Sequence, residues 1–234
     1  MEHKAGYVNI IGNPNVGKST LMNALVGERL SIITSKAQTT RHRILGIVND
    51  EQHQIVFSDT PGVMNPAYKL QENMMDFVHG AFQDADILLY MVETGEKGLK
   101  DQKLFERLKN TDLPILLLLN KIDRVEQDFV KEQIVFWKEL LPNAEIHPIS
   151  ALNKFNLDLV MARIKALLPV SPPYFERDTL TDKSERFFVS ETIREKIIKY
   201  YKKEIPYSVE IEVEEFFDED DIIKIRATIF VTRE

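Results

Sequence analysis

The sequence predicts an α/β fold in which a mostly parallel six-stranded sheet is followed by a smaller α+β unit. Two observations support this prediction. Apolar, strand-like runs alternate with helical patterns over the first 168 residues, and a proline-rich break at Pro169–Pro173 precedes a different pattern. The strands of the main sheet are expected at Tyr7–Ile11, Ile44–Val48, Gln54–Phe57, Ile87–Val92, Ile115–Leu119 and Ile146–Ile149.

Each run has features of a strand in such a sheet. Ile87–Val92 and Ile115–Leu119 are continuous in apolar residues, as expected of strands that are covered on both faces. Ile146–Ile149 is assigned to the same class of strand, although His147 interrupts its apolar run. The second and third are joined only by the polar turn Asn49–Gln52, so we expect one antiparallel strand at the edge of the sheet. Helices are expected at Lys18–Val26, Asp101–Lys109, Glu126–Leu141 and Leu157–Leu168.

The pattern divides the chain into three parts, with expected bounds of 1–168, 169–186 and 187–234. The middle part is expected to be a linker, because its prolines cannot continue a helix and its polar residues have little to bury.

The third part predicts an α-β-β unit. Alternating apolar and polar residues around Val209–Glu214 and Ile223–Thr232 predict two strands with one buried sheet face. A preceding amphipathic helix is indicated by apolar residues that recur every four positions, at Val189, Ile193, Ile197 and Tyr201.

Composition limits the classes of function. The chain has 44% hydrophobic and 29% charged residues, as a soluble globular protein does, and its apolar runs are too short to span a membrane. It has no cysteine, which excludes disulfides and thiolate metal sites. Its formal net charge of −7 argues against non-specific nucleic-acid binding by the whole molecule, although a local basic patch is compatible with it.

The segment Gly12–Ser19 fits the P-loop pattern G-x-x-x-x-G-K-[ST] between a predicted strand and a predicted helix. In such a loop, backbone N–H groups surround the phosphates, Lys18 places a cation over them, and the Ser19 hydroxyl ligates Mg²⁺. The alternative is a glycine-rich turn without a ligand, which the strand–loop–helix context disfavours. The nucleotide-binding residues expected here are Asn13, Asn15, Val16, Gly17, Lys18, Ser19 and Thr20.

A second motif, Asp59-Thr60-Pro61-Gly62, follows the strand Gln54–Phe57. A carboxylate at this position can hold Mg²⁺ through a water molecule, and Gly62 leaves a backbone N–H free to contact the γ-phosphate. Alone, Asp-x-x-Gly is a common turn. Its position after a P-loop favours the phosphate site.

The segment Asn120-Lys121-Ile122-Asp123 predicts guanine as the base. The carboxylate of Asp123 only accepts hydrogen bonds, and guanine presents two adjacent donors where adenine presents no such pair. Asn120 can join neighbouring loops, and the stem of Lys121 can lie over the ring. Backbone N–H groups of Ser150-Ala151-Leu152 complete the expected base pocket; taken alone, this tripeptide would be a helix cap.

Together these segments resemble the Era family of bacterial ribosome-assembly GTPases, whose P-loop NTPase fold is a Ras-like G domain followed by a KH domain. Three further stretches carry the resemblance beyond the nucleotide motifs. They are the first-switch segment Lys36–Ile44, the linker segment Asp178–Phe187, and the pair Ile193–Lys196 and Glu204–Val209 at the opening of the KH domain.

The resemblance implies a GTP- and GDP-binding enzyme that hydrolyses GTP, with Lys18, Thr40 and Gly62 in catalysis. Ser19, Thr40 and Asp59 would hold Mg²⁺, with Thr39 as the competing switch threonine. Ras-like enzymes carry a water-orienting glutamine where this chain has Val63. Asn15 matches an asparagine that coordinates K⁺ in this wider group, so we expect K⁺ to stimulate turnover.

The implied partners are small-subunit ribosomal RNA and the small ribosomal subunit. A KH domain holds RNA with a Gly-x-x-Gly loop, and no glycine follows Gly98 here, so we expect an incomplete KH domain and impaired RNA binding. The resemblance also implies a cytoplasmic monomer, with peripheral association at the cytoplasmic face of the inner membrane. Val63 leaves a second hypothesis open, a binding module in which hydrolysis is incidental.

Overall fold

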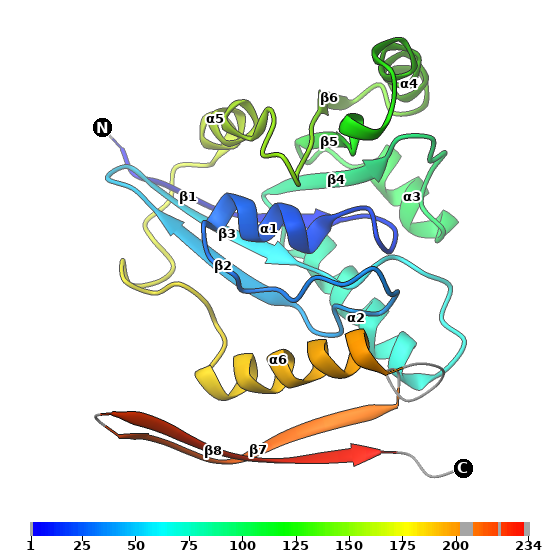
Figure 1. The fold of residues 1–234 in the computed structure, drawn as a ribbon. Coiled ribbons are helices and arrows are strands. Elements are labelled where there is room, and N and C mark those ends of the chain that lie inside the picture. The colour runs from blue at the N-terminus through cyan, green and yellow to red at the C-terminus, as the bar shows by residue number, and fades with distance from the viewer. Residues whose placement is uncertain (1, 202–207, 220, 232–234) are drawn as a thin grey trace.

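The computed structural model describes residues 2–201, 208–219 and 221–231. Its main body is a six-stranded sheet in the order β2-β3-β1-β4-β5-β6 (Figure 1). Only β2 runs antiparallel to its neighbour, which confirms the predicted single antiparallel edge strand. The strands are β1 Lys4–Ile11, β2 Ile44–Asn49, β3 His53–Asp59, β4 Ile87–Glu93, β5 Ile115–Asn120 and β6 Ala144–Pro148.

Helices cover both faces of this sheet. The side chains of β4 alternate between two apolar clusters: Leu89 packs in one with α1 and α5, and Tyr90 in the other with α2, α3 and α4. The two-sided burial explains why the central strands are continuously apolar. The helices are α1 Lys18–Val26, α2 Lys69–Gln83, α3 Gln102–Lys109, α4 Gln127–Leu140 and α5 Leu157–Leu167, and a 3₁₀ turn, η1, spans Ile122–Arg124.

The topology fixes where a ligand can lie. β1 is hydrogen-bonded to β3 on one side and β4 on the other, and all three run parallel. The chain crosses over on either side of β1, and in open α/β sheets ligands bind beyond the carboxyl ends of strands at such a point. The loops that follow β1, β3, β5 and β6 therefore meet at one edge of the sheet.

The segment that was expected to be a linker covers the exposed edge of β2. The amide of Ile47 donates to the Leu180 oxygen over 2.8 Å, and the Thr181 hydroxyl donates to the Leu45 oxygen over 2.7 Å. An open strand edge invites pairing with other chains, so this cover protects the sheet. Helix α6, Glu185–Tyr200, then begins at the capping residue Ser184.

Helix α6 differs from the predicted amphipathic helix. Ile197 is buried as expected, but Tyr201 lies beyond the end of the helix and is 53% exposed. The buried face instead carries three charged residues, Glu191, Arg194 and Glu195. They are buried because each forms an ion pair, and apolar periodicity alone could not reveal that.

The chain ends in an antiparallel hairpin of β7, Val209–Glu219, and β8, Ile222–Val231 (Figure 1). The predicted α-β-β order is therefore present. Several of its large apolar side chains, including Ile223, Ile225 and Ile229, are exposed. Residues 204–207 of the predicted KH opening, and residue 232 at the end of the second predicted strand, lie outside the described residues.

Candidate nucleotide site

The loop after β1 has the backbone of a phosphate-binding loop. Asn15 adopts φ 65° and Gly17 adopts φ 109°, both in the left-handed region. Gly17 also lies against Asn120, because a Cβ at Gly17 would come within 2.5 Å of the Asn120 amide nitrogen. Glycine is therefore required at position 17 for both its backbone conformation and its lack of a side chain.

Lys18 is buried beneath this loop. Its Nζ donates to the main-chain oxygens of Gly12 and Asn13 over 3.1 and 2.9 Å. Burial lowers the pKa of Lys18 from 10.5 to about 8, although Asp59 and Glu96 oppose the shift. A phosphate next to Nζ would favour the charged form, as the nearby carboxylates do.

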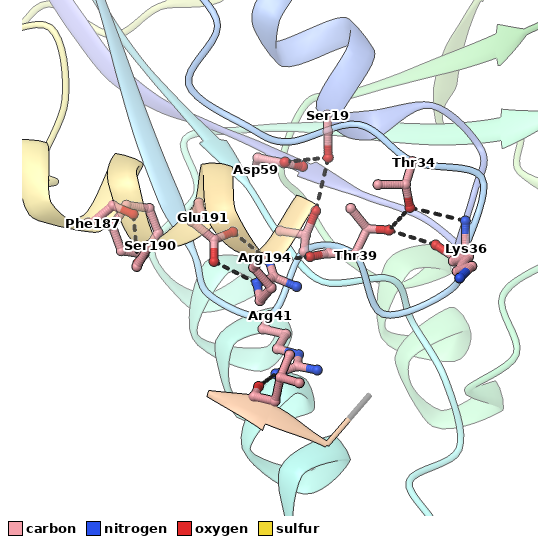
Figure 2. Close-up of polar contacts among 12 residues, drawn as sticks. Ser19, Thr34, Lys36, Thr39, Arg41, Asp59, Phe187, Ser190, Glu191 and Arg194 are labelled. Atoms are coloured by element: carbon pink, nitrogen blue, oxygen red, sulfur yellow. Dashed lines mark hydrogen bonds and ion pairs between the residues drawn. The ribbon is translucent and has the colours of Figure 1, made fainter. Parts of the chain in front are cut away.

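Three predicted metal ligands lie together. The Ser19 hydroxyl donates to Asp59 Oδ2 over 2.7 Å (Figure 2). The hydroxyls of Ser19 and Thr40 are 2.9 Å apart. Asp59 is fully buried, and burial raises the pKa of its carboxyl. Two hydroxyls and a carboxylate are the hard oxygen ligands that Mg²⁺ prefers, so these residues fit that ion.

Thr39 points away from this cluster. Its hydroxyl donates to the Lys36 oxygen over 2.7 Å and lies 2.6 Å from the hydroxyl of Thr34 (Figure 2). Of the two threonines that the sequence left in competition, only Thr40 has its hydroxyl against Ser19.

The base motif is joined to the phosphate loop through Asn120. Its amide donates to the Val16 oxygen over 2.7 Å, and its side-chain oxygen accepts from the amide of Ala151 over 2.9 Å. One side chain thus joins the loops after β1, β5 and β6. Lys121 adopts φ 64° and pairs with Glu93 at 2.5 Å.

One cavity of about 420 Å³ connects these motifs. It is lined by twelve of the predicted site residues and by the competing threonine: Asn15, Gly17, Lys18, Ser19, Thr20, Thr39, Thr40, Gly62, Asn120, Lys121, Asp123, Ala151 and Leu152 all contribute. Its volume is within the usual range for a small-molecule site.

Four predicted residues stand behind the cavity wall. Asp59 lies beneath Ser19, and Val16 is buried in the core. Ser150 pairs through its backbone with Phe155. The amide of Asn13 donates to the Gly98 oxygen over 2.9 Å and so holds the loop after β4.

Part of the cavity wall is formed by residues that were not predicted from the sequence. Ile32, Ile33, Thr34, Ser35 and Gln38 line the cavity from the segment that precedes Thr39. The first four of these residues carry no motif, and the available signal was their position just before the first-switch stretch Lys36–Ile44, which includes Gln38.

Gly62 and Val63 differ in how they face the site. A Cβ at Gly62 would lie 2.6 Å from the Cα of Pro14, so this glycine is pressed against the phosphate loop. The Val63 amide donates to the Gly12 oxygen over 2.9 Å, and its side chain is fully buried in an apolar cluster. The Val63 side chain therefore lies in the core and does not reach the cavity.

Comparison with known proteins identifies relatives along the whole chain. The family described as 50S ribosome-binding GTPase matches residues 7–121. GTPase Era of Staphylococcus haemolyticus is 41% identical over 235 residues, which cover 100% of this chain and 79% of that protein. GTPase Era of Alkaliphilus metalliredigens is 40% identical, over 98% of this chain and 79% of its own length.

Similar solved structures point to the same family as the sequence relatives. A structure of Era in complex with MgGDPNP and nucleotides 1506–1542 of 16S ribosomal RNA superposes with a TM-score of 0.92 at 35% identity, over 99% of this chain and 80% of that one. A variant of Aquifex aeolicus Era bound to GDP and AlF4⁻ gives 0.92 at 36% identity, with the same coverage. Elongation factor SelB of Methanococcus maripaludis, at 22% identity and 0.56, shares the fold alone.

Proposed function

The chain belongs to the Era family of GTPases, and from this premise we propose that it is a GTP-driven switch that acts on the small ribosomal subunit through ribosomal RNA. Membership of the family makes it a guanine-nucleotide-binding protein that hydrolyses GTP. The choice of the small subunit is supported by the similar Era structure that contains 16S ribosomal RNA. The matched family is named for the large (50S) subunit, and its model covers residues 7–121 of this chain.

The observation that carries the nucleotide part of the proposal is the continuous cavity from Lys18 to Asp123. In the proposed arrangement, Lys18 and the loop amides hold the phosphates, while Asp123 accepts from the two donors of guanine. Asn120 fixes the distance between these two ends, because it bonds to both neighbouring loops.

Ser19 and Thr40 are proposed to hold Mg²⁺ directly, with Asp59 behind them. When bound, this ion would supply positive charge beside the β- and γ-phosphates. The chain itself brings the two hydroxyls within 2.9 Å and aligns Ser19 through its bond to Asp59. Thr40 can therefore respond to the γ-phosphate end of the nucleotide, as a switch threonine must.

Hydrolysis in this chain needs a group other than residue 63. The Val63 side chain is buried, so it cannot position a water molecule. We propose that Gly62 presents its N–H to the γ-phosphate and that Asn15 helps to hold K⁺ nearby. A cation there would stabilise the negative charge that builds up during phosphoryl transfer.

The potassium proposal is tested by single-turnover hydrolysis in KCl and in NaCl at equal ionic strength. We expect faster turnover in KCl, and loss of the difference in Asn15→Ala. Equal rates of the unaltered protein in the two salts would remove K⁺ from the mechanism.

The switch proposal is tested by single-turnover hydrolysis with and without purified small ribosomal subunits. Acceleration by the subunits supports a timer whose GTP state is read by the ribosome. An unchanged, negligible rate would support the binding module, in which the nucleotide mainly stabilises the fold. Large subunits serve as the matched control, because they carry RNA of the same general charge.

The finer parts of the proposal concern assembly and location. We propose a cytoplasmic monomer with peripheral association at the inner membrane, supported by the family resemblance alone. Within the described residues, no helix has the length and apolarity needed to cross a bilayer. Light scattering would test the monomer, and sedimentation with anionic vesicles, using neutral vesicles as control, would test the membrane association.

A further inference from the structure

A charged residue of α6 touches the switch segment. The guanidinium of Arg194 donates through Nη2 to the main-chain oxygen of Thr39 over 2.5 Å (Figure 2). Two bonds to Glu191, of 2.7 and 2.5 Å, hold the guanidinium in place. Arg194 is 4% exposed, so the contact is made in a place nearly free of water.

Neighbouring contacts enclose the same segment. On one side of Thr39, Lys36 Nζ donates to the main-chain oxygen of Tyr201 over 2.7 Å. On the other, Arg41 Nη1 donates to the main-chain oxygen of Val209 over 2.9 Å. The stretch from residue 36 to residue 41 is thus fixed at three points by the C-terminal part of the chain.

The contact at Thr39 bears directly on Thr40. The main-chain oxygen of Thr39 belongs to the peptide group that joins Thr39 to Thr40, and this group is planar and stiff. Fixing that oxygen therefore restricts the direction in which Thr40 leaves the backbone. In the structure this direction places the Thr40 hydroxyl 2.9 Å from Ser19.

The buried ion pair of Arg194 and Glu191 makes movement of Thr39 away from Arg194 energetically unfavourable. A buried ion pair contributes little net stability, but a buried charged donor that loses its acceptor is unfavourable. If Thr39 moved away, the guanidinium would lose a bond that water does not readily replace. The pair therefore favours the arrangement in which Thr40 faces Ser19.

We propose that Arg194, on helix α6, is a positioning residue for the GTPase site. Its contact with Thr39 holds Thr40 in the position from which Thr40 can ligate the metal ion of bound GTP. The inference rests on the proposed role of Thr40. Because coupling is reciprocal, GTP that captures Thr40 also strengthens the contact between α6 and the switch segment. GDP, which has no γ-phosphate, gains little from Arg194.

The test compares the affinities of the whole chain for a non-hydrolysable GTP analogue and for GDP, both with Mg²⁺. We expect Arg194→Ala to weaken analogue binding about tenfold, the loss of one charge-assisted hydrogen bond, and to change GDP binding less than about twofold. The concentration of Mg²⁺ needed for half-maximal hydrolysis should rise in the same variant.

Arg29→Ala is the matched control. Arg29 also joins the G domain to α6, through an ion pair with Glu195, and its side chain is 64% exposed. Glu195 keeps Lys199 as a partner at 3.0 Å. This variant should leave the ratio of the two affinities unchanged, because it removes an ion pair to α6 without touching Thr39.

Two further variants make every outcome decisive. If Arg194→Ala does not fold, Arg194→Lys takes its place. Lysine keeps a cation beside Glu191, but its single nitrogen cannot reproduce the several bonds of the guanidinium, so the same loss of selectivity is expected.

Thr40→Ala tests the proposed role of Thr40, on which the inference rests. Loss of selectivity in Thr40→Ala but not in the Arg194 variants overturns the inference alone, whereas no loss in Thr40→Ala overturns the proposed role of Thr40. An equal loss of selectivity in Arg29→Ala would mean that any contact between α6 and the rest of the chain has this effect, and that Arg194 has no specific role in positioning Thr40.

Discussion

The side-chain amide of Asn120 donates a hydrogen bond of 2.7 Å to the main-chain oxygen of Val16, and so joins the end of β5 to the phosphate loop. The bond is buried, and the other end of the Asn120 amide accepts from Ala151. Asn120→Ala leaves both backbone groups without their partner. We expect it to weaken GTP and GDP binding alike, by about 30-fold, since each unsatisfied buried group costs roughly 1–3 kcal/mol.

Calorimetric titration with each nucleotide checks the Asn120 prediction. The matched control is Asn143→Ala, whose amide makes only long, exposed bonds to Lys109 and Thr111. Selective loss of GTP affinity, with GDP affinity retained, would contradict a role for Asn120 in holding the two ends of the cavity together.

Asp123 determines the choice of base in the proposed site. Asp123→Asn places a donor where guanine also presents a donor, so we expect GTP affinity to fall at least about 100-fold. Xanthine has an oxygen at that position, and XTP should restore binding and hydrolysis. Competition between labelled GTP and XTP measures the exchange of preference.

Asp128→Asn is the control for Asp123, since Asp128 is an exposed acid on α4 that pairs with Lys131. It removes one negative charge without altering the cavity. If Asp123→Asn kept its preference for GTP, guanine recognition would have to come from another group.

The two switch threonines should differ in their effects. Thr40→Ala removes the hydroxyl beside Ser19, and we expect hydrolysis to fall about 100-fold, because groups that stabilise developing charge contribute on that order. Thr39→Ala removes only bonds within the loop, to Lys36 and Thr34, so a change of about threefold or less is expected. If Thr39→Ala slowed single-turnover hydrolysis more than Thr40→Ala, Thr39 would be the metal ligand instead of Thr40.

The sequence was most informative where chemistry is local. The Gly12–Ser19 pattern and the Asn120–Asp123 segment predicted residues that the structure gathers around one cavity. Continuous apolar runs predicted the central strands, because two-sided burial leaves a direct mark on composition. The helix at Asp101 was also local: the Asp101 side chain caps α3 by accepting from the amide of Leu104 over 3.1 Å.

The features that sequence reasoning missed depend on distant partners. The charged face of α6 was predicted to be apolar, because nothing near Arg194 in the chain indicates an acceptor at Thr39. The linker was expected to bury little, yet it pairs with β2 through Leu180 and Thr181. Such pairings are decided by tertiary packing, which local periodicity does not encode.

His147 should make the fold sensitive to mild acid. Burial lowers the pKa of this imidazole below 6.5, although Glu145 opposes the shift. As the pH falls below 6.5, the unfolded chain takes up the proton first, so the free energy of unfolding declines until the folded form is protonated as well. His147→Gln removes this contribution and should lose less stability between pH 7 and pH 5.

Urea unfolding at the two pH values measures the effect of His147. His42 shifts in the same direction because of its burial, so the variant should retain part of the acid sensitivity. A larger loss in His147→Gln than in the unaltered protein would mean that the imidazole is stabilised in its charged form.

Gly62 couples the loop after β3 to the phosphate loop through close contact. An added methyl group would lie 2.6 Å from the Cα of Pro14, which is backbone and cannot rotate away. Gly62→Ala must therefore push the two loops apart and strain the bond from the Val63 amide to the Gly12 oxygen. We expect hydrolysis to fall about 100-fold, because the N–H that we propose to contact the γ-phosphate is displaced.

GDP binding separates this effect from a general loss of structure. GDP has no γ-phosphate, so its affinity for Gly62→Ala should stay within about threefold of the unaltered protein. Gly80→Ala is the matched control, because Gly80 lies in α2 with no atom within 4 Å of an added methyl group. That exchange favours the helix and should leave turnover unchanged. If Gly62→Ala hydrolysed GTP at the normal rate, the close approach of Gly62 to the phosphate loop would have no part in catalysis, and charge stabilisation would have to come from Lys18 and the bound cations alone.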